Sequence, residues 1–190
     1  MKTSCFALLL ATLALPAAAD TAIDSHTLRR DIVGKWASVA PEAYDKVYAT
    51  RQFIITAKRW GVLFKVYADA AATQPLFHLN VGGPYLLGAS AVKVPDAIEG
   101  IFPADIRMLI ADSPAGVQLF ADQGCRLRQG QPLPLVQQGC GFVPSLMQNM
   151  GEYDLVAIRN GQLFFGDRSG DLSKTRPDKL TPYPLRRLPR

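Results

Sequence analysis

The sequence predicts a mainly β protein, built as a single antiparallel β-barrel, with a β-sandwich as the alternative. Between residues 47 and 165, short runs rich in β-branched and aromatic residues alternate with Gly, Pro or Asp. Short strands at a spacing of roughly 8–12 residues are typical of sandwiches and barrels. In addition, two alternating runs flank Asn160-Gly161, the dipeptide that a two-residue hairpin favours.

The first 19 residues have the features of a secretory signal peptide. Lys2 supplies a positive charge, an apolar run extends from Cys5 to Leu15, and Ala17-Ala18-Ala19 follows. We therefore expect cleavage near Ala19 and an exported protein, periplasmic or secreted. This run is shorter than the roughly 20 residues of a membrane-spanning helix, and no later run approaches that length, so no membrane span is expected.

Removal of residues 1–19 leaves 171 residues (190 − 19), which suits one domain. We expect residues 20–175 to form the barrel and residues 176–190 to form a basic, proline-rich strap with a frayed end. The alternative role for this tail is contact with an envelope protein or an anionic surface. No nucleic-acid partner is expected. The basic residues of the tail are Arg176, Lys179, Arg186, Arg187 and Arg190.

The N-terminal part of the mature chain predicts a helix followed by a strand pair. A short helix is predicted within residues 23–36, with Ser25 near its cap and Leu28, Ile32 and Val33 on one face. Residues 47–70 predict a strand pair that turns near residues 57–59. In its second half, the even-numbered residues from 60 to 68 share one face, while Lys65 and Tyr67 share the other.

Residues 75–94 predict a second strand pair that turns at Val81-Gly82-Gly83-Pro84. Further strands are predicted at residues 97–102, 105–112 and 116–122. Residues 124–150 read as a long loop, in which one helical turn with Ser145 near its cap is expected after Pro144. An even number of cysteines in an exported chain favours a disulfide between Cys125 and Cys140, with buried free thiols as the alternative.

The segment Asp31–Ser38, DIVGKWAS, carries Gly34-Lys35-Trp36 just before the strand series. A Gly-x-Trp at this place resembles the lipocalins and the wider calycin group. The resemblance implies that Trp36 closes one end of an up-and-down barrel and that an arginine near the last strand packs on it. Arg168 is the first candidate for this arginine and Arg159 the second. An ordinary core position is the alternative interpretation of Trp36.

No catalytic motif is legible, so we expect no enzyme, no catalytic residue and no cofactor. A zinc site is not expected either, because the two histidines, His26 and His78, are far apart in the sequence. The cluster from Asp167 to Asp171 loosely resembles the start of a calcium loop. A structural turn fits it better, in which Asp167 or Asp171 pairs with Arg168 or Arg176.

Three functions remain open. The first is the binding of a small, largely apolar ligand in the barrel. The second is an interaction or inhibitor module that displays the loop between Cys125 and Cys140 together with the basic tail. The third is an enzyme of undefined reaction, for which His78, Asp167 and Arg168 would be mutated first. The predicted ligand-binding residues are Trp60, Phe64, Tyr67, His78 and Tyr85, with Phe53, Phe77, Phe164 and Phe165 as further candidates for the lumen.

Overall fold

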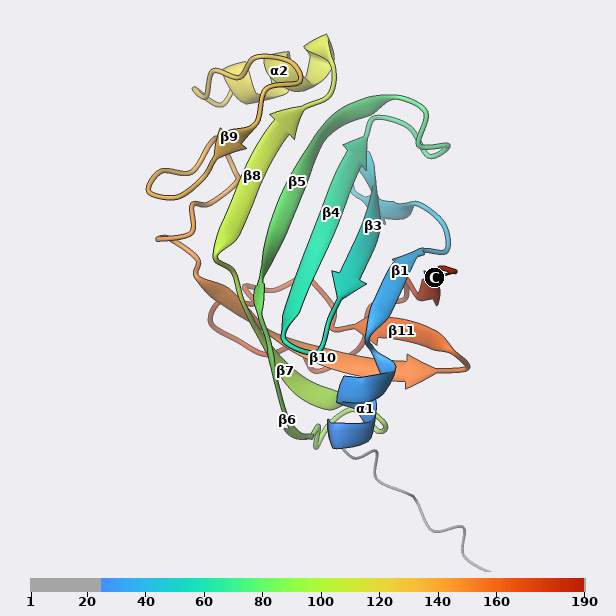
Figure 1. Ribbon diagram of the computed structural model, residues 1–190. Coiled ribbons are helices and arrows are strands. Elements are labelled where there is room, and N and C mark those ends of the chain that lie inside the picture. The colour runs from blue at the N-terminus through green and yellow to red at the C-terminus, as the bar shows by residue number, and fades with distance from the viewer. Residues whose placement is uncertain (1–24, 190) are drawn as a thin grey trace, which may run out of the picture.

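The described residues form a single, strongly curled antiparallel sheet, a half-barrel, with two short helices (Figure 1). The computed structural model describes residues 25–189, so the predicted signal peptide lies outside the described residues. The mainly β class and the single antiparallel sheet are confirmed. The barrel stays open, because the strands at the two ends of the pairing order do not pair with each other.

The strand order explains the shape. It runs β6-β7-β10-β11-β12-β1-β3-β4-β5-β8-β9, with β2 beside β3. In Figure 1, β10 and β11 cross below β3, β4 and β5, so that the sheet has an upper part and a lower part. In chain order the elements are α1 (Ser25–Asp31), β1 (Gly34–Ser38), β2 (Glu42–Tyr44), β3 (Val47–Ile55), β4 (Arg59–Tyr67), β5 (Pro75–Pro84), β6 (Leu86–Ser90), β7 (Ile98–Pro103), β8 (Ile106–Ala111), α2 (Pro114–Ala121), β9 (Leu133–Pro134), β10 (Gly151–Arg159), β11 (Gln162–Phe165) and β12 (Leu185–Arg187).

Several local predictions are confirmed. The strand pair β3–β4 forms, and β10 and β11 are joined by Asn160-Gly161 at φ 51° and 73°, the positive values that this hairpin turn requires. The short helix is α1, which buries Leu28, and Ile32 directly after its end is also buried. The predicted apolar face is wrong at Val33, which lies after the end of the helix and is 37% exposed.

The predicted turn at residues 81–84 is wrong. Strand β5 runs unbroken through these residues, and β6 pairs with β7 instead of returning along β5. Neither Gly82 nor Gly83 has a positive φ. A Cβ on Gly83 would lie 2.2 Å from the carbonyl oxygen of Pro103, so this glycine permits a close approach of two backbones and not a turn.

The strand predicted at residues 116–122 is also wrong, because this segment lies mostly in helix α2. Ser113 caps the helix by accepting a hydrogen bond from the Gly116 amide, and Pro114 follows in the first turn. The helix buries Phe120 against Phe77, with the rings edge to face and their centroids 5.0 Å apart. Tertiary packing of one aromatic side chain therefore outweighs the weak strand pattern.

The long loop at residues 124–150 is confirmed, and the disulfide between Cys125 and Cys140 closes it with a Cα separation of 5.3 Å. The helical turn predicted after Pro144 is confirmed as a single turn, in which the Asn149 amide donates to the Ser145 carbonyl oxygen at 3.0 Å. Ser145 and Gln148 hold this turn reciprocally, since each side chain accepts a hydrogen bond from the other residue's amide, at 2.8 and 3.2 Å.

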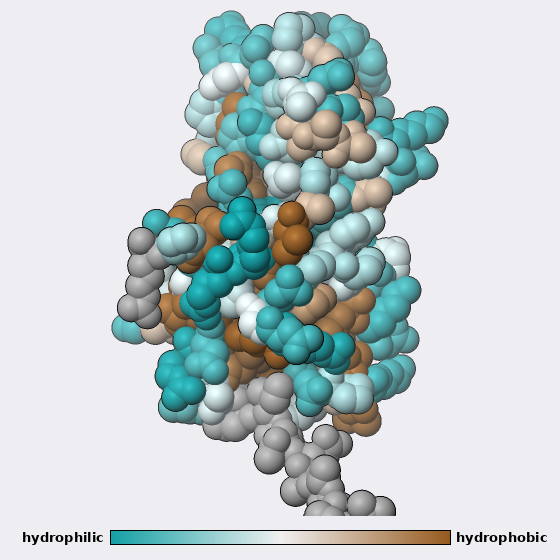
Figure 2. All heavy atoms as spheres, turned by 90° about the vertical axis from the view of Figure 1, so that its right-hand side faces the viewer, coloured by the Kyte–Doolittle hydropathy of each residue, from teal (hydrophilic) through white to brown (hydrophobic). Residues whose placement is uncertain are grey.

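Two main hydrophobic clusters fill the molecule. The lower cluster gathers around Trp36 and Phe165 and includes residues of α1, and the upper cluster gathers around Phe77 and Phe120 beneath α2 and the long loop. Figure 2 shows hydrophobic side chains between hydrophilic ones in the lower half of one face, whereas the upper half of that face is mostly hydrophilic. Residues of both clusters line a cavity between them.

The arginine on Trp36 is Arg187, so the assignments of Arg168 and Arg159 are wrong. The guanidinium of Arg187 lies 4.2 Å from the Trp36 ring centroid and donates hydrogen bonds to the carbonyl oxygens of Asp31 and Val33, at the end of α1. This position arises because β12 is a strand of the sheet that pairs Arg187 opposite Trp36. Strand β12, within the segment predicted as a strap, pairs with both β1 and β11.

Gly34 is fitted to the same contact. Its φ of 144° is a value that L side chains rarely adopt, and a Cβ there would lie 2.6 Å from Nη1 of Arg187. Trp36 itself is 1% exposed and donates from Nε1 to the Ile32 carbonyl oxygen at 2.8 Å. The Gly-x-Trp segment thus joins α1, β1 and β12.

We predict that Arg187→Ala lowers the free energy of unfolding by about 1–3 kcal/mol, because it removes a cation–π contact and two hydrogen bonds. Urea denaturation followed by circular dichroism measures this change. Arg186→Ala is the matched control, since the Arg186 side chain is exposed on the same strand and makes no hydrogen bond to the described residues. Equal losses in the two variants would contradict the role given to Arg187.

Candidate ligand cavity

A cavity of about 240 Å³ lies between the upper and lower parts of the curled sheet. Strands β3, β4 and β5 supply one wall, β7, β10 and β11 the facing wall, and residues 143–149 of the long loop contribute a rim. Most of the wall is apolar and aromatic. Its aromatic and branched residues include Phe53, Trp60, Val62, Phe64, Phe102 and Phe165.

Contacts between the aromatic rings hold this wall in place. Phe53 and Phe165 stack at 4.7 Å between centroids, and Trp60 meets Phe102 edge to face at 5.6 Å. The Trp60 indole N–H also donates to the Pro103 carbonyl oxygen at 3.1 Å. The rings are thus positioned by neighbours from the facing strands.

The structure brings only part of the predicted ligand-binding set together. Trp60 and Phe64 line the cavity, whereas Tyr67 and His78 are absent from its lining. Tyr85 packs in the lower cluster, where its hydroxyl donates to the Thr56 carbonyl oxygen at 2.9 Å. Of the further candidates, Phe53 and Phe165 line the cavity, and Phe77 and Phe164 do not.

Sequence reasoning missed Phe102 and four of the five charged residues of the cavity, and it named Arg168 only in a structural or catalytic role. The alternation in β7, with Ile98, Gly100 and Phe102 on the buried face, is the signal that could have found Phe102. The charged residues are Arg51, Arg107, Glu152, Asp154 and Arg168. They come from four separate segments, so no local motif connects them.

Arg51 belongs to a buried ion pair. Its Nε donates to Glu42 Oε1 at 2.7 Å, and both side chains are almost fully excluded from solvent. Ser38 and Tyr44 donate to the same carboxylate at 2.9 and 2.8 Å, and Nη2 of Arg51 donates to the Tyr183 carbonyl oxygen. The partners of Arg51 and Glu42 come from the protein itself. This ion pair therefore stabilises the edge of the cavity and leaves little uncompensated charge there.

Arg168 lies between two carboxylates. It donates to Glu152 and, at 3.3 Å, to Asp154 Oδ2, and this ionic contact raises the pKa of its guanidinium although burial acts to lower it. Asp154 also accepts amide hydrogen bonds from Leu155 and Gly166, each at 2.7 Å. Burial nevertheless raises the pKa of Asp154 to about 6, outweighing Arg168 and the two amides.

Arg107, on β8, differs from the other two arginines. It is 7% exposed, and its hydrogen bonds to the described residues run from Nη1 to the carbonyl oxygens of Pro144 and Ser145, at 2.9 and 3.0 Å. Within residues 25–189 it forms no ion pair. Burial lowers the pKa of its guanidinium, and the charge of Glu152 only partly offsets this effect.

His78 takes part in a separate cluster. Its Nδ1 lies 2.8 Å from Asp112 Oδ1, and Lys65 Nζ lies 3.7 Å from Asp112 Oδ2, an ion pair too long to be a hydrogen bond. Asp112 Oδ2 is buried without a hydrogen-bond partner. Lys65 and His78 are cross-strand neighbours, and the alternation of β4 and β5 places them away from Phe64 and Leu79, which line the cavity.

Asp167 and Asp171 form two separate local turns. Asp167 accepts the amide of Ser169, and Asp171 accepts the amide of Ser173. Their ion-pair partners are Lys179 at 3.9 Å and Lys174 at 2.8 Å, so the predicted pairing with Arg168 or Arg176 is wrong. Arg176 instead donates to the carbonyl oxygens of Gly100 and Asp154. In the described part of the chain, no cluster of three or more His, Cys, Asp or Glu side chains could hold a metal ion.

Comparisons with known proteins add no family. No protein-family model matches the chain, and no curated protein is found as a relative. Among the described residues, neither helix is long and apolar enough to cross a bilayer.

We predict that Asp154 makes stability depend on pH in a specific direction. A carboxyl whose pKa rises from 3.8 when unfolded to about 6 when folded binds its proton more tightly in the folded state. Its contribution to stability is therefore full below pH 4 and is lost as the pH rises through 6. The loss is on the order of 2–3 kcal/mol relative to Asp154→Asn, whose amide oxygen can still accept from Leu155 and Gly166.

Urea denaturation of both proteins between pH 4 and pH 7.5 measures this difference. We expect the wild-type protein to lose stability relative to Asp154→Asn as the pH rises. Parallel stability curves would show that the Asp154 carboxyl keeps its ordinary pKa.

Proposed function

We propose that this protein binds a small, largely apolar ligand in the half-barrel cavity and acts as a carrier, not an enzyme. The observation that supports this most directly is the aromatic wall around an open volume of about 240 Å³. This volume lies just below the range of roughly 300–1,000 Å³ for pockets that hold drug-sized ligands. It suits a smaller molecule with a mainly hydrocarbon body.

The carrier is lipocalin-like in its use of a curled antiparallel sheet around a ligand. Trp36 beneath Arg187 would seal one end of the sheet, as the resemblance implies for the tryptophan of that family. Export fits the same proposal, because the disulfide between Cys125 and Cys140 is typical of oxidising compartments.

Native purification followed by solvent extraction and mass spectrometry tests for a resident ligand. We expect a small apolar molecule to co-purify with the wild-type protein. A preparation without any co-purifying molecule, combined with no change in tryptophan fluorescence across a series of fatty acids, alcohols and isoprenoids, would exclude the carrier function.

We predict that Val62→Phe weakens binding of a neutral apolar probe such as 1-decanol by about tenfold or more, because the larger ring occupies part of the cavity. Leu63→Phe is the matched control, since Leu63 is the next residue of β4 and is absent from the cavity lining. Isothermal titration calorimetry measures both affinities. Equal weakening in the two variants would place the probe elsewhere.

The alternative function, an envelope interaction or inhibitor module, draws support from the long loop. Val136, Phe142, Met147 and Met150 are between 52% and 71% exposed there. A pull-down with the wild-type protein and a Val136→Ser/Met147→Ser variant tests this alternative. Captured proteins that do not differ between the two would count against it. Deleting residues 176–190 is a poor test, because it removes β12.

A further inference from the structure

Arg107 is a buried cation at the wall of an apolar cavity. The register between β5 and β8 sets Arg107 opposite Val81, and both residues line the cavity. A charged group with little exposure requires compensation, because the loss of its hydration costs several kcal/mol. In this structure, that compensation consists of two neutral carbonyl oxygens.

The other two arginines of the cavity are matched by carboxylates. Arg51 is paired with Glu42, and Arg168 is paired with both Glu152 and Asp154. Arg107 has no carboxylate within 4.0 Å among residues 25–189. The positive charge available to a ligand in the cavity is therefore concentrated on one side chain.

The hydrogen bonds of Arg107 also leave one edge of its guanidinium without a partner among the described residues. Both carbonyl contacts use the two N–H groups of Nη1. The remaining donors are on Nε and Nη2, which together present two parallel N–H groups. This pair matches the two oxygens of a carboxylate, the geometry in which arginine binds that group most strongly.

We propose that the ligand is a short amphiphile with one carboxylate, held by Arg107, and a hydrocarbon body that lies along the aromatic wall. This inference rests on the proposed carrier function and specifies its class of ligand. The small volume of the cavity favours a medium-length chain over a long one.

Glu152 is the acidic group that opposes this binding. It lines the same cavity and acts electrostatically on Arg107, while its hydrogen bond goes to Arg168. Asp154 is also bound to Arg168 and to two amides. A carboxylate at Arg107 thus displaces no existing ion pair, but it is repelled by Glu152.

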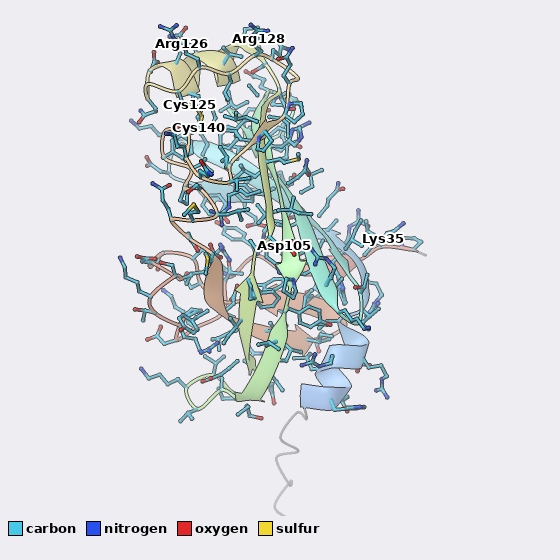
Figure 3. The ribbon with its side chains drawn as sticks, turned by 60° about the vertical axis from the view of Figure 1, so that its left-hand side comes forward. Lys35, Asp105, Cys125, Arg126, Arg128 and Cys140 are labelled. Carbon is cyan, nitrogen blue, oxygen red and sulfur yellow. A yellow bond between two sulfur atoms is a disulfide. The ribbon has the colours of Figure 1, made fainter. Side chains whose placement is uncertain are left out.

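Calorimetric titration of the full-length mature protein at neutral pH with decanoate and with 1-decanol tests the proposal. The two probes share a chain and differ in head-group charge. We expect the wild-type protein to bind decanoate at least about tenfold more tightly. Arg107→Met should lose this preference while keeping its affinity for 1-decanol. Arg126→Met is the control, because Arg126 is exposed at the far upper end of the molecule (Figure 3).

The outcomes distinguish the role of Arg107 from the carrier function. Equal affinity of the wild-type protein for both probes would overturn the role of Arg107 and leave the carrier function standing. Binding of neither probe would overturn both. If Arg107→Met does not fold, Glu152→Gln retains Arg107 and should tighten decanoate binding several-fold. Unchanged decanoate affinity in Glu152→Gln would also contradict a carboxylate at Arg107.

Discussion

The architecture depends on the pairing of β12 with two other strands. Residues Leu185–Arg187 lie between β11 and β1, and they join the lower part of the sheet to the upper part. Leu185 is fully buried in the lower cluster, and Arg187 covers Trp36 at the end of α1. Without this short strand the two walls of the cavity would belong to unconnected sheets. The position of the cavity is therefore set by a segment that does not itself line it.

The cavity combines an apolar wall with ionic groups. Burying a charged group costs free energy unless a partner compensates its charge. The chain meets this requirement at Arg51 with the Glu42 carboxylate and the Tyr183 carbonyl oxygen, and at Arg168 with two carboxylates. Asp154 shows the residual cost, because burial raises its pKa despite three hydrogen bonds. Arg107 is the place where compensation is least complete. Such local exceptions to an otherwise consistent structure are expected at sites that bind ligands.

Local sequence signals predicted those features that depend on neighbouring residues. Asn160-Gly161 indicated its hairpin because only positive φ values close a two-residue turn there, and the cysteine count indicated the disulfide. Long-range pairing was not predictable in this way. A glycine in the sequence is compatible both with a turn and with a close approach of two backbones. Only the contact with Pro103 shows that Gly83 serves the close approach. The charged residues of the cavity are 2 to 117 positions apart (168 − 51 = 117), so they form a group only after the sheet has curled.

The dimensions of the cavity are fixed largely by backbone contacts. A Cβ on Gly83 or Gly151 would lie 2.2 or 2.9 Å from backbone atoms of Pro103, so the crossing of β5, β7 and β10 tolerates only glycine at these two positions. The β12 pairing fixes the other side. Side chains on the wall, such as Val62 and Val81, can then differ in size without altering the frame. The backbone frame is thus separable from the wall, and under the proposed function the ligand preference would reside in the wall and in Arg107.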